Sequence, residues 1–234
     1  MNQKTLRRRR IVGAVFFALF AVLTVYSNED LWQPVMSAGS AFSDIVQKNE
    51  VRNLLEEIPI KGRAPKTAYS RDQFGGGWAT KKGCDTRNII LYRDLVDVAV
   101  DEGCIVISGA LDDPYTGEMI QFRRGASSSA KVQIDHVVAL SDAWQKGAQQ
   151  LTYDERVVFA NDPLVLLAVD GPANQEKGDG DSATWLPPNK SFRCQYVARQ
   201  VAIKAKYDLW VTQAEYDAMI RVLERCPDQL LPTA

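Results

Sequence analysis

The sequence predicts an α+β fold, and three observations lead to this class. Short apolar runs of strand length, bounded by turn residues, occur at 104–109, 131–138 and 164–169. Segments with helical periodicity or helix-capping signals lie at 42–58, 152–159 and 190–225. The chain contains no internal repeat. We therefore expect short strands packed with helices, including a β-hairpin and a C-terminal helical hairpin.

The first 28 residues have the pattern of an export signal. Met1–Arg10 contains five basic residues and no acidic one, and 11–26 is almost wholly apolar. A basic region followed by a short apolar region is typical of a secretory signal peptide. The alternative is an uncleaved N-terminal membrane anchor. Both alternatives export Glu29 onward, so we expect a secreted protein or an extracellular protein anchored to the membrane through residues 1–28 only.

About 205 residues follow this leader, which suits one domain with a substantial core. We assign 29–60 to a linker and an N-terminal helix and 61–234 to the functional domain, and we expect a monomer. Without the five basic residues of the leader the chain has 23 basic and 29 acidic residues, a net charge of −6. This balance argues against a tight non-specific polyanion binder, so a nucleic-acid role needs a local basic face and a metal.

The cysteines predict two disulfides. They are even in number, widely spaced and part of a chain with an export signal. The predicted helices at 190–207 and 213–225 are joined by a short turn, and an antiparallel pair with arms of roughly 20 Å brings Cys194 level with Cys226. That pairing leaves Cys84 with Cys104. We do not expect a structural zinc site, because the chain has no CxxC and a single histidine.

The first half of the chain contains a predicted helix, a loop and a β-hairpin. The apolar spacing predicts a helix at 42–58 that Pro59 ends, and 61–83 is loop-like. The loop contains Gly75-Gly76-Gly77-Trp78, which lacks the spacing of a phosphate loop and receives no nucleotide role. The apolar residues of segment 85–100 suit two alternatives, a single helix or a strand that is followed by a helix. A β-hairpin joins 104–109 to 119–122 through the turn residues 112–117.

The second half alternates strands and capped helices. A strand is predicted at 131–138 and another at 164–169, and the capping box Thr152–Glu155 opens a helix between them that 161–163 ends. A helix begins near Pro172, because proline is favoured at the first helical position. A second capping box, Thr212–Glu215, opens the last helix.

His136 is the single histidine of the chain and the first candidate for acid–base chemistry near neutral pH. Asp135 beside it is a candidate metal ligand. Adjacent strand residues point to opposite faces, so the two can share a site only at a strand end or a twist. The alternative is a histidine that only packs at the end of a strand.

The residues after His136 extend this site into a longer motif. A helical stretch leads to Asn161, a second strand follows, and the next helix carries Asn174. This order resembles the HNH endonuclease family, above all the branch shared with the C-terminal domain of GmrSD-type modification-dependent restriction enzymes and small exported HNH proteins. The motif covers 131–181, and a looser likeness runs from 69 to 226. Ala139 departs from the proline found in many relatives, which should affect loop stiffness only.

The resemblance implies a ββα-metal core, also called a His-Me finger, at 131–181 that hydrolyses phosphodiester bonds in nucleic acid, DNA foremost. His136 would be the general base, and Asn161 would brace the loop and orient the imidazole. Asp135 and Asn174 would hold one divalent metal. Their oxygen ligands suit Mg²⁺ or Mn²⁺ better than zinc.

The candidate substrate-binding cations are less specific. Lys177 lies one helical turn from Asn174, where it could meet a phosphate, and Arg123 and Arg124 precede the Asp-His strand. Helix 190–207 has five basic residues and no acidic one, which makes it the strongest basic patch of the exported part. The competing interpretation is a non-catalytic, disulfide-stapled extracellular binding or inhibitor module that retains the HNH scaffold.

Overall fold

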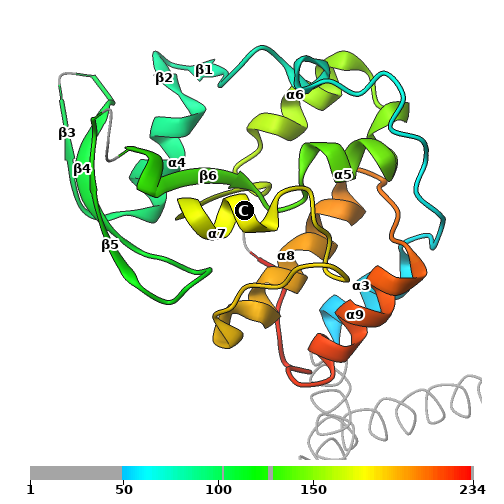
Figure 1. Ribbon diagram of the computed structural model, residues 1–234. Coiled ribbons are helices and arrows are strands. Elements are labelled where there is room, and N and C mark those ends of the chain that lie inside the picture. The colour runs from blue at the N-terminus through cyan, green and yellow to red at the C-terminus, as the bar shows by residue number, and fades with distance from the viewer. Residues whose placement is uncertain (1–48, 102, 126–128, 233–234) are drawn as a thin grey trace, which may run out of the picture. The chain divides into compact units, whose positions relative to one another are not determined.

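The computed structural model describes residues 49–101, 103–125 and 129–232. Within these ranges the chain forms seven α-helices and three small antiparallel sheets (Figure 1). The mixed helix and strand content predicted from the sequence is therefore confirmed. The predicted leader and most of the predicted linker lie outside the described residues. None of the helices in the described part combines the length and the apolar character that a membrane span requires.

The N-terminal helix and the following loop pack against the C-terminal half. Helix α3 (Glu50–Glu57) buries Val51 and Leu55 and confirms the described part of the helix predicted at 42–58. The 3₁₀ turn η1 (Arg71–Phe74) inserts Phe74 into the core, where its ring lies 6.0 Å from that of Phe159. The rest of 61–79 is irregular, as predicted.

Helix α4 (Thr86–Asp94) precedes the first long sheet. A short ribbon of β1 (Thr80–Lys81) and β2 (Cys84–Asp85) leads into it, and the Asp85 carboxylate accepts a hydrogen bond from the amide of Asn88. Strand β3 (Val96–Val100) follows. Segment 85–100 is thus a helix followed by a strand, an order that neither sequence alternative had. The Asp85 cap explains it, because the helix starts where this side chain can satisfy free amides.

The predicted β-hairpin is confirmed and forms part of a three-stranded sheet with the order β3-β4-β5. Strands β4 (Val106–Asp112) and β5 (Met119–Arg123) pair antiparallel from Ser108 to Asp112. The turn between them is fixed by Asp113, whose carboxylate accepts from the amide of Thr116 at 2.7 Å and from its hydroxyl at 2.6 Å. This sheet lies at one side of the molecule, and the β4–β5 end of the sheet approaches helix α8 (Arg193–Lys206) (Figure 1).

The central unit is a strand–strand–helix arrangement. Strands β6 (Val132–His136) and β7 (Leu166–Asp170) pair antiparallel, and α7 (Gly171–Lys177) follows directly and packs on both. Helices α5 (Leu140–Gln145) and α6 (Tyr153–Asn161) lie between the strands in sequence. A Cβ at position 171 would lie 2.1 Å from the carbonyl oxygen of Ala130, so only glycine lets α7 start this close to the turn that precedes β6.

The C-terminal helices form the predicted disulfide-linked hairpin. Helices α8 (Arg193–Lys206) and α9 (Gln213–Leu223) are joined by a short turn, and Cys194 is bonded to Cys226. Cys84 is bonded to Cys104, so both predicted pairings are correct. The Thr212 hydroxyl caps α9, but the second half of the predicted capping box is missing because Glu215 is used elsewhere.

Glu215 belongs to what we call the buried ion cluster, which joins α5, α8, α9 and the segment after α7. Lys146 lies at its centre and approaches Asp142 at 2.8 Å, Asp181 at 2.7 Å and Glu215 at 2.6 Å. Lys204 approaches Glu215 at 3.0 Å. Neither lysine is exposed to solvent. The helical half of the domain is therefore tied together by charges as well as by apolar packing.

Candidate active site

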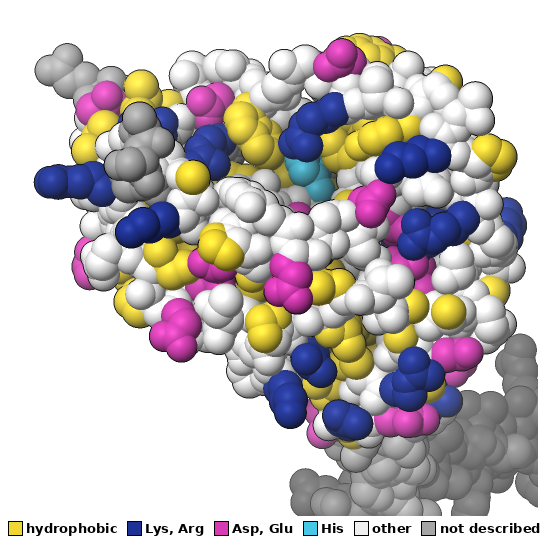
Figure 2. Space-filling view, viewed as in Figure 1, with side chains coloured by type: hydrophobic (Ala, Val, Ile, Leu, Met, Phe, Trp, Pro, Cys, Tyr) yellow, Lys and Arg dark blue, Asp and Glu magenta, His cyan; other side chains and the backbone are white. Residues whose placement is uncertain are grey.

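Asp135 and His136 lie at the end of β6, whose last residue is His136. This is the position that the sequence required if adjacent residues are to share a site. Both residues line one open cavity of about 430 Å³. In Figure 2 the histidine lies deep in a hollow of the surface, with basic side chains at its rim.

The imidazole of His136 is held in one orientation. Its Nε2 lies 3.0 Å from the carbonyl oxygen of Ala160, at the end of α6, and its ring is parallel to that of Trp78 with centroids 5.7 Å apart. Burial lowers the pKa of His136 to about 3, and the positive charges of Arg71 and Lys177 act in the same direction. A carbonyl oxygen only accepts, so Nε2 carries the proton and Nδ1 keeps its lone pair.

Both carboxylate oxygens of Asp135 accept hydrogen bonds. Lys177 donates to one of them at 2.9 Å and the Tyr115 hydroxyl donates to the other. Burial raises the pKa of Asp135, although these two partners oppose the shift. The pKa of Tyr115 is raised well above its usual value by burial and by the nearby carboxylate. Tyr115 is therefore a neutral donor to Asp135.

Asn174 lines the same cavity from α7. Its amide nitrogen donates to Oε1 of Gln133 at 2.8 Å, and within the described ranges no hydrogen bond reaches its Oδ1. The structure thus brings together three of the predicted site residues, Asp135, His136 and Asn174. A free carboxamide oxygen and a carboxylate now border the same space.

The donor set is compatible with a hydrated Mg²⁺ or Mn²⁺ ion. Each carboxylate oxygen has two lone pairs, so Asp135 can accept a further partner beside Lys177 and Tyr115. Mg²⁺ commonly binds one or two carboxylates and keeps several waters. No group of three or more His, Cys, Asp or Glu side chains suited to a metal occurs in the described part of the chain. Such a hydrated ion would therefore depend on Asp135 and Asn174, protein oxygen donors that border the cavity.

Asn161 lies outside this cavity and holds a neighbouring loop. Its Oδ1 accepts from the amide of Ala79 at 2.8 Å and from the hydroxyl of Thr86 at 2.8 Å. Its side chain makes no hydrogen bond with His136. The preceding residue, Ala160, provides the carbonyl that contacts the imidazole.

The predicted substrate-binding cations are not gathered at the cavity. Lys177 is buried and donates to Asp135 and to the carbonyl of His136. Arg124 donates to Asn88 and to the carbonyl of Val106, and Arg123 lies at the exposed end of β5. Neither arginine lines the cavity.

The basic patch predicted on 190–207 is also broken up. Lys204 is buried in the ion cluster and Arg199 donates to the carbonyl of Leu164. Sequence reasoning missed three contributors to the site, Tyr115, Trp78 and Arg71. The Asp113–Gly117 turn was the one signal for Tyr115, because it belongs to the looser family likeness.

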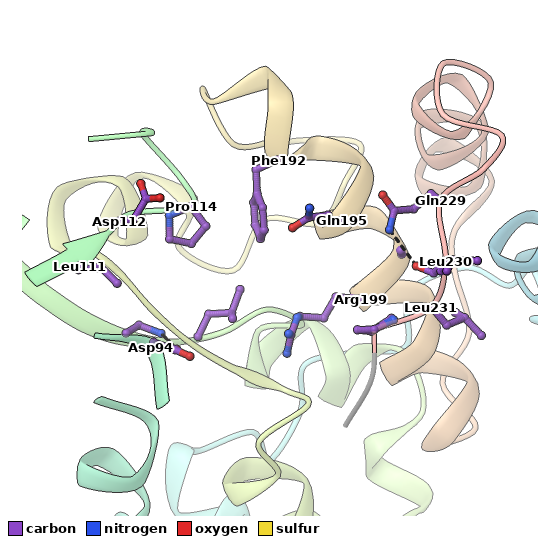
Figure 3. A pocket seen from close by; sticks show the side chains of 14 residues that line it. Asp94, Leu111, Asp112, Pro114, Phe192, Gln195, Arg199, Gln229, Leu230 and Leu231 are labelled. Atoms are coloured by element: carbon purple, nitrogen blue, oxygen red, sulfur yellow. Dashed lines mark hydrogen bonds between the residues drawn. The ribbon is translucent and has the colours of Figure 1, made fainter. Parts of the chain in front are cut away.

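A second cavity, of about 400 Å³, lies between β4, α8 and the C-terminal residues (Figure 3). It contains none of the predicted site residues. Asp94 accepts from the amide of Ala168, and Arg199 donates to the carbonyl of Leu164. Arg93 donates to the carbonyl of Leu166. These charged side chains therefore cover the outer edge of β7.

Asp135, His136 and Asn174 border one cavity beside the strand–strand–helix unit, and a family match assigns the chain to an HNH-type, nuclease-related class. The family of GmrSD restriction endonucleases, C-terminal domain, matches residues 86–222, and the chain belongs to this family. A curated relative, called "Uncharacterized secreted protein", from Arthroderma benhamiae is 38% identical over 186 residues, covering 78% of this chain and 88% of that protein. No solved structure shows a significant match. The secreted relative and the two disulfides are consistent with an extracellular location.

Proposed function

We propose that this protein is an exported, divalent-metal-dependent endonuclease that hydrolyses phosphodiester bonds in nucleic acid, DNA foremost. One observation carries the proposal: an imidazole borders the same cavity as a carboxylate and a carboxamide oxygen, and neither the imidazole Nδ1 nor the carboxamide oxygen has a hydrogen-bond partner among the residues that the structure describes. Membership of a restriction-endonuclease domain family supports the same chemistry.

His136 is the general base in this proposal. Its Nδ1 takes a proton from a water molecule, whose oxygen attacks the phosphorus while the bond to the leaving oxygen breaks. The hydrogen bond from Nε2 to Ala160 fixes the tautomer that this step needs. Trp78 lies parallel to the imidazole and helps to hold its orientation.

Asp135 and Asn174 would hold the metal. When bound, such an ion neutralises charge that develops on the phosphate and the leaving oxygen. Lys177 and Tyr115 orient the Asp135 carboxylate and leave lone pairs directed elsewhere. Asn161 is a positioning residue, because it fixes the loop that carries Trp78 to the end of α6.

The direct test incubates the purified exported chain with supercoiled plasmid DNA and Mg²⁺. We expect nicking or cutting that EDTA abolishes. His136→Ala should abolish it as well while Arg52→Ala, on the exposed face of α3, cuts as the wild type does. Thermal unfolding of each variant separates loss of chemistry from loss of fold. Full activity in a folded His136→Ala variant would remove the general base from the proposal.

The second candidate is an extracellular binding or inhibitor module without catalysis. The pairing of Asp135 with Lys177 favours it, since a protein cation already neutralises the carboxylate that would hold the metal. A wild-type chain that cuts neither DNA nor RNA, in duplex or single-stranded form, with Mg²⁺ or Mn²⁺ would favour this module over the nuclease.

A further inference from the structure

Residues 69–79 form one wall of the candidate active site, although they precede the segment 86–222 that matches the family. Tyr69, Arg71 and Trp78 line the cavity that also contains Asp135 and His136. The site is therefore not built from the family segment alone. We call residues 69–79 the N-terminal wall.

Helix α6 fixes the N-terminal wall at two points. Arg156, in the first half of α6, donates to the carbonyl of Gln73 at 2.9 Å and to its side-chain oxygen at 3.1 Å. Asn161, the last residue of α6, accepts from the amide of Ala79. Between them Phe74 is buried in the core. The backbone that carries Arg71 is thus held in a defined place relative to the imidazole.

A smaller cavity of about 200 Å³ lies beside the first and shares Arg71, Trp78 and His136 with it. Gly75, Gly76 and Gly77 line it. Gly75 and Gly77 have φ values of 98° and 150°, which side-chain-bearing residues rarely adopt. The absence of side chains along this run keeps the space next to Arg71 and His136 open for an extended ligand.

Arg71 differs from the other cations near this wall. Arg63 is paired with Asp181, Lys66 with Asp179, and Arg87 donates to the carbonyl of Val132. Arg71 is exposed, and no hydrogen bond or ion pair joins its guanidinium to another residue within the described ranges. In a chain whose exported part is acidic, this unpaired guanidinium borders both cavities around the general base.

We propose, on the basis of the proposed nuclease function, that Arg71 is the phosphate-binding cation of this site and donates to the non-bridging oxygens of the phosphate that His136-activated water attacks. A guanidinium suits this role because its planar fork matches phosphate oxygens two at a time. Arg71 thereby takes the role that the sequence assigned to Lys177, Arg123 and Arg124. The N-terminal wall makes the family segment competent to bind its substrate.

Two measurements on the full chain test the role of Arg71. The first is equilibrium binding of a short labelled DNA duplex by His136→Ala protein over a range of salt concentrations. Adding Arg71→Ala should weaken binding and reduce the slope of log K against log[salt] by about 0.9, the value for one phosphate contact. Arg71→Lys should keep the slope, and Arg52→Ala should change neither quantity.

The second measurement is cleavage by protein that retains His136. Arg71→Ala should lower kcat/KM about 100-fold, as removal of a donor to transition-state charge does elsewhere. Arg71→Lys should retain only part of the wild-type kcat/KM, because an ammonium cannot present two parallel donors.

The outcomes separate this inference from the nuclease proposal. Wild-type cleavage with an unchanged rate and salt slope in Arg71→Ala would overturn the role of Arg71 and leave the nuclease intact. A lowered slope without any wild-type cleavage would support Arg71 as the phosphate ligand and refute hydrolysis. A parallel titration with RNA of the same sequence identifies the preferred polymer, and a wild-type chain that binds neither polymer overturns the inference.

Discussion

At the scale of single residues, the pair Lys177–Asp135 decides how much of the site is preformed. Both side chains are almost completely buried, and the lysine also donates to the carbonyl of His136. The carboxylate is therefore oriented before any ligand arrives. Removing one partner would leave a charge in a poorly solvated place, which is much more costly than losing the pair together.

Lys177→Met should consequently lower the free energy of unfolding by about 3–5 kcal/mol, and adding Asp135→Asn should recover much of this loss. Lys206→Met serves as the matched control, because its pair with Asp162 involves a half-exposed lysine and should be worth about 1 kcal/mol or less. Denaturant unfolding of the wild type, Lys177→Met, Asp135→Asn and the double variant measures the coupling, with Lys206→Met as a fifth protein. Equal losses for the two lysines would show that Lys177 is not effectively buried.

The residues of the site differ in how far the sequence reveals them. Asp135, His136 and Asn174 form a motif with a recognisable order, and the structure brings them to one cavity. Tyr115 and Arg71 lie far from this motif in the sequence and carry no periodic or spacing signal. The sequence shows which residues are helical neighbours of Lys177, but it does not show that Lys177 is buried. A phosphate contact was therefore predicted where the structure has an ion pair.

At the scale of elements, α6 controls the site from both of its ends. Its capping box, formed by Thr152 and Glu155, fixes its first turn next to Arg156, which binds the N-terminal wall. Its last turn provides the carbonyl of Ala160 for the imidazole and Asn161 for the loop at Ala79. A helix of nine residues is thus hydrogen-bonded both to the imidazole and to the N-terminal wall.

Thr152→Ala should therefore lower both stability and cleavage. Loss of an N-cap costs about 1 kcal/mol, which corresponds to roughly 2–4 °C in Tm for a domain of this size. Thr212→Ala removes the corresponding cap of α9, far from the cavity in the sequence, and should cost similar stability without the loss of activity. Thermal unfolding and plasmid cleavage of both variants make the comparison. Equal cleavage rates in the two would show that α6 does not position the site.

Element positions were largely predictable because caps and turn residues mark the helix ends. Both hairpins and the helix at Thr152 were located in this way. The order of α4 and β3 was not, since apolar residues at 89–100 suit a buried helix and a strand equally well. A complete capping box was predicted at Thr212, but only its first half forms. The sequence does not show that Glu215 instead contacts two buried lysines.

At the scale of the whole molecule, the buried ion cluster makes stability depend on pH. Burial alone would raise the pKa of Asp181, but Lys146 and Arg63 outweigh it and lower this pKa to about 2. The value in the unfolded chain is higher, so folding favours the charged form. The contribution of Asp181 is therefore present above about pH 4 and is lost as the pH falls toward 2.

Asp181→Asn should be less stable than the wild type at pH 6, and the difference should shrink between about pH 4 and pH 2. The control Asp217→Asn, at an exposed position of α9, should keep the wild-type dependence. Tm measured from pH 6 to pH 2 tests this expectation. A constant difference between wild type and Asp181→Asn over the whole range would contradict the shifted pKa.

Contacts between residues far apart in the sequence were predictable only where a count of residues along two helices was sufficient. Equal distances from one turn located the Cys194–Cys226 bond. A basic surface patch was predicted on α8, one of the helices that this bond joins. The sequence does not show that Asp142 and Glu215 approach Lys204 from other helices. Charge counts alone could therefore not separate a surface patch from a buried network.

The outer edge of β7 has a consequence for how this protein behaves among its own copies. Arg93, Arg199 and Asp94 already satisfy the outward carbonyl and amide groups of Leu164, Leu166 and Ala168. An open strand edge is a template on which another polypeptide can add a strand, and charged cover removes it. The outer edge of β7 is thereby protected against edge-to-edge pairing with another copy of the chain.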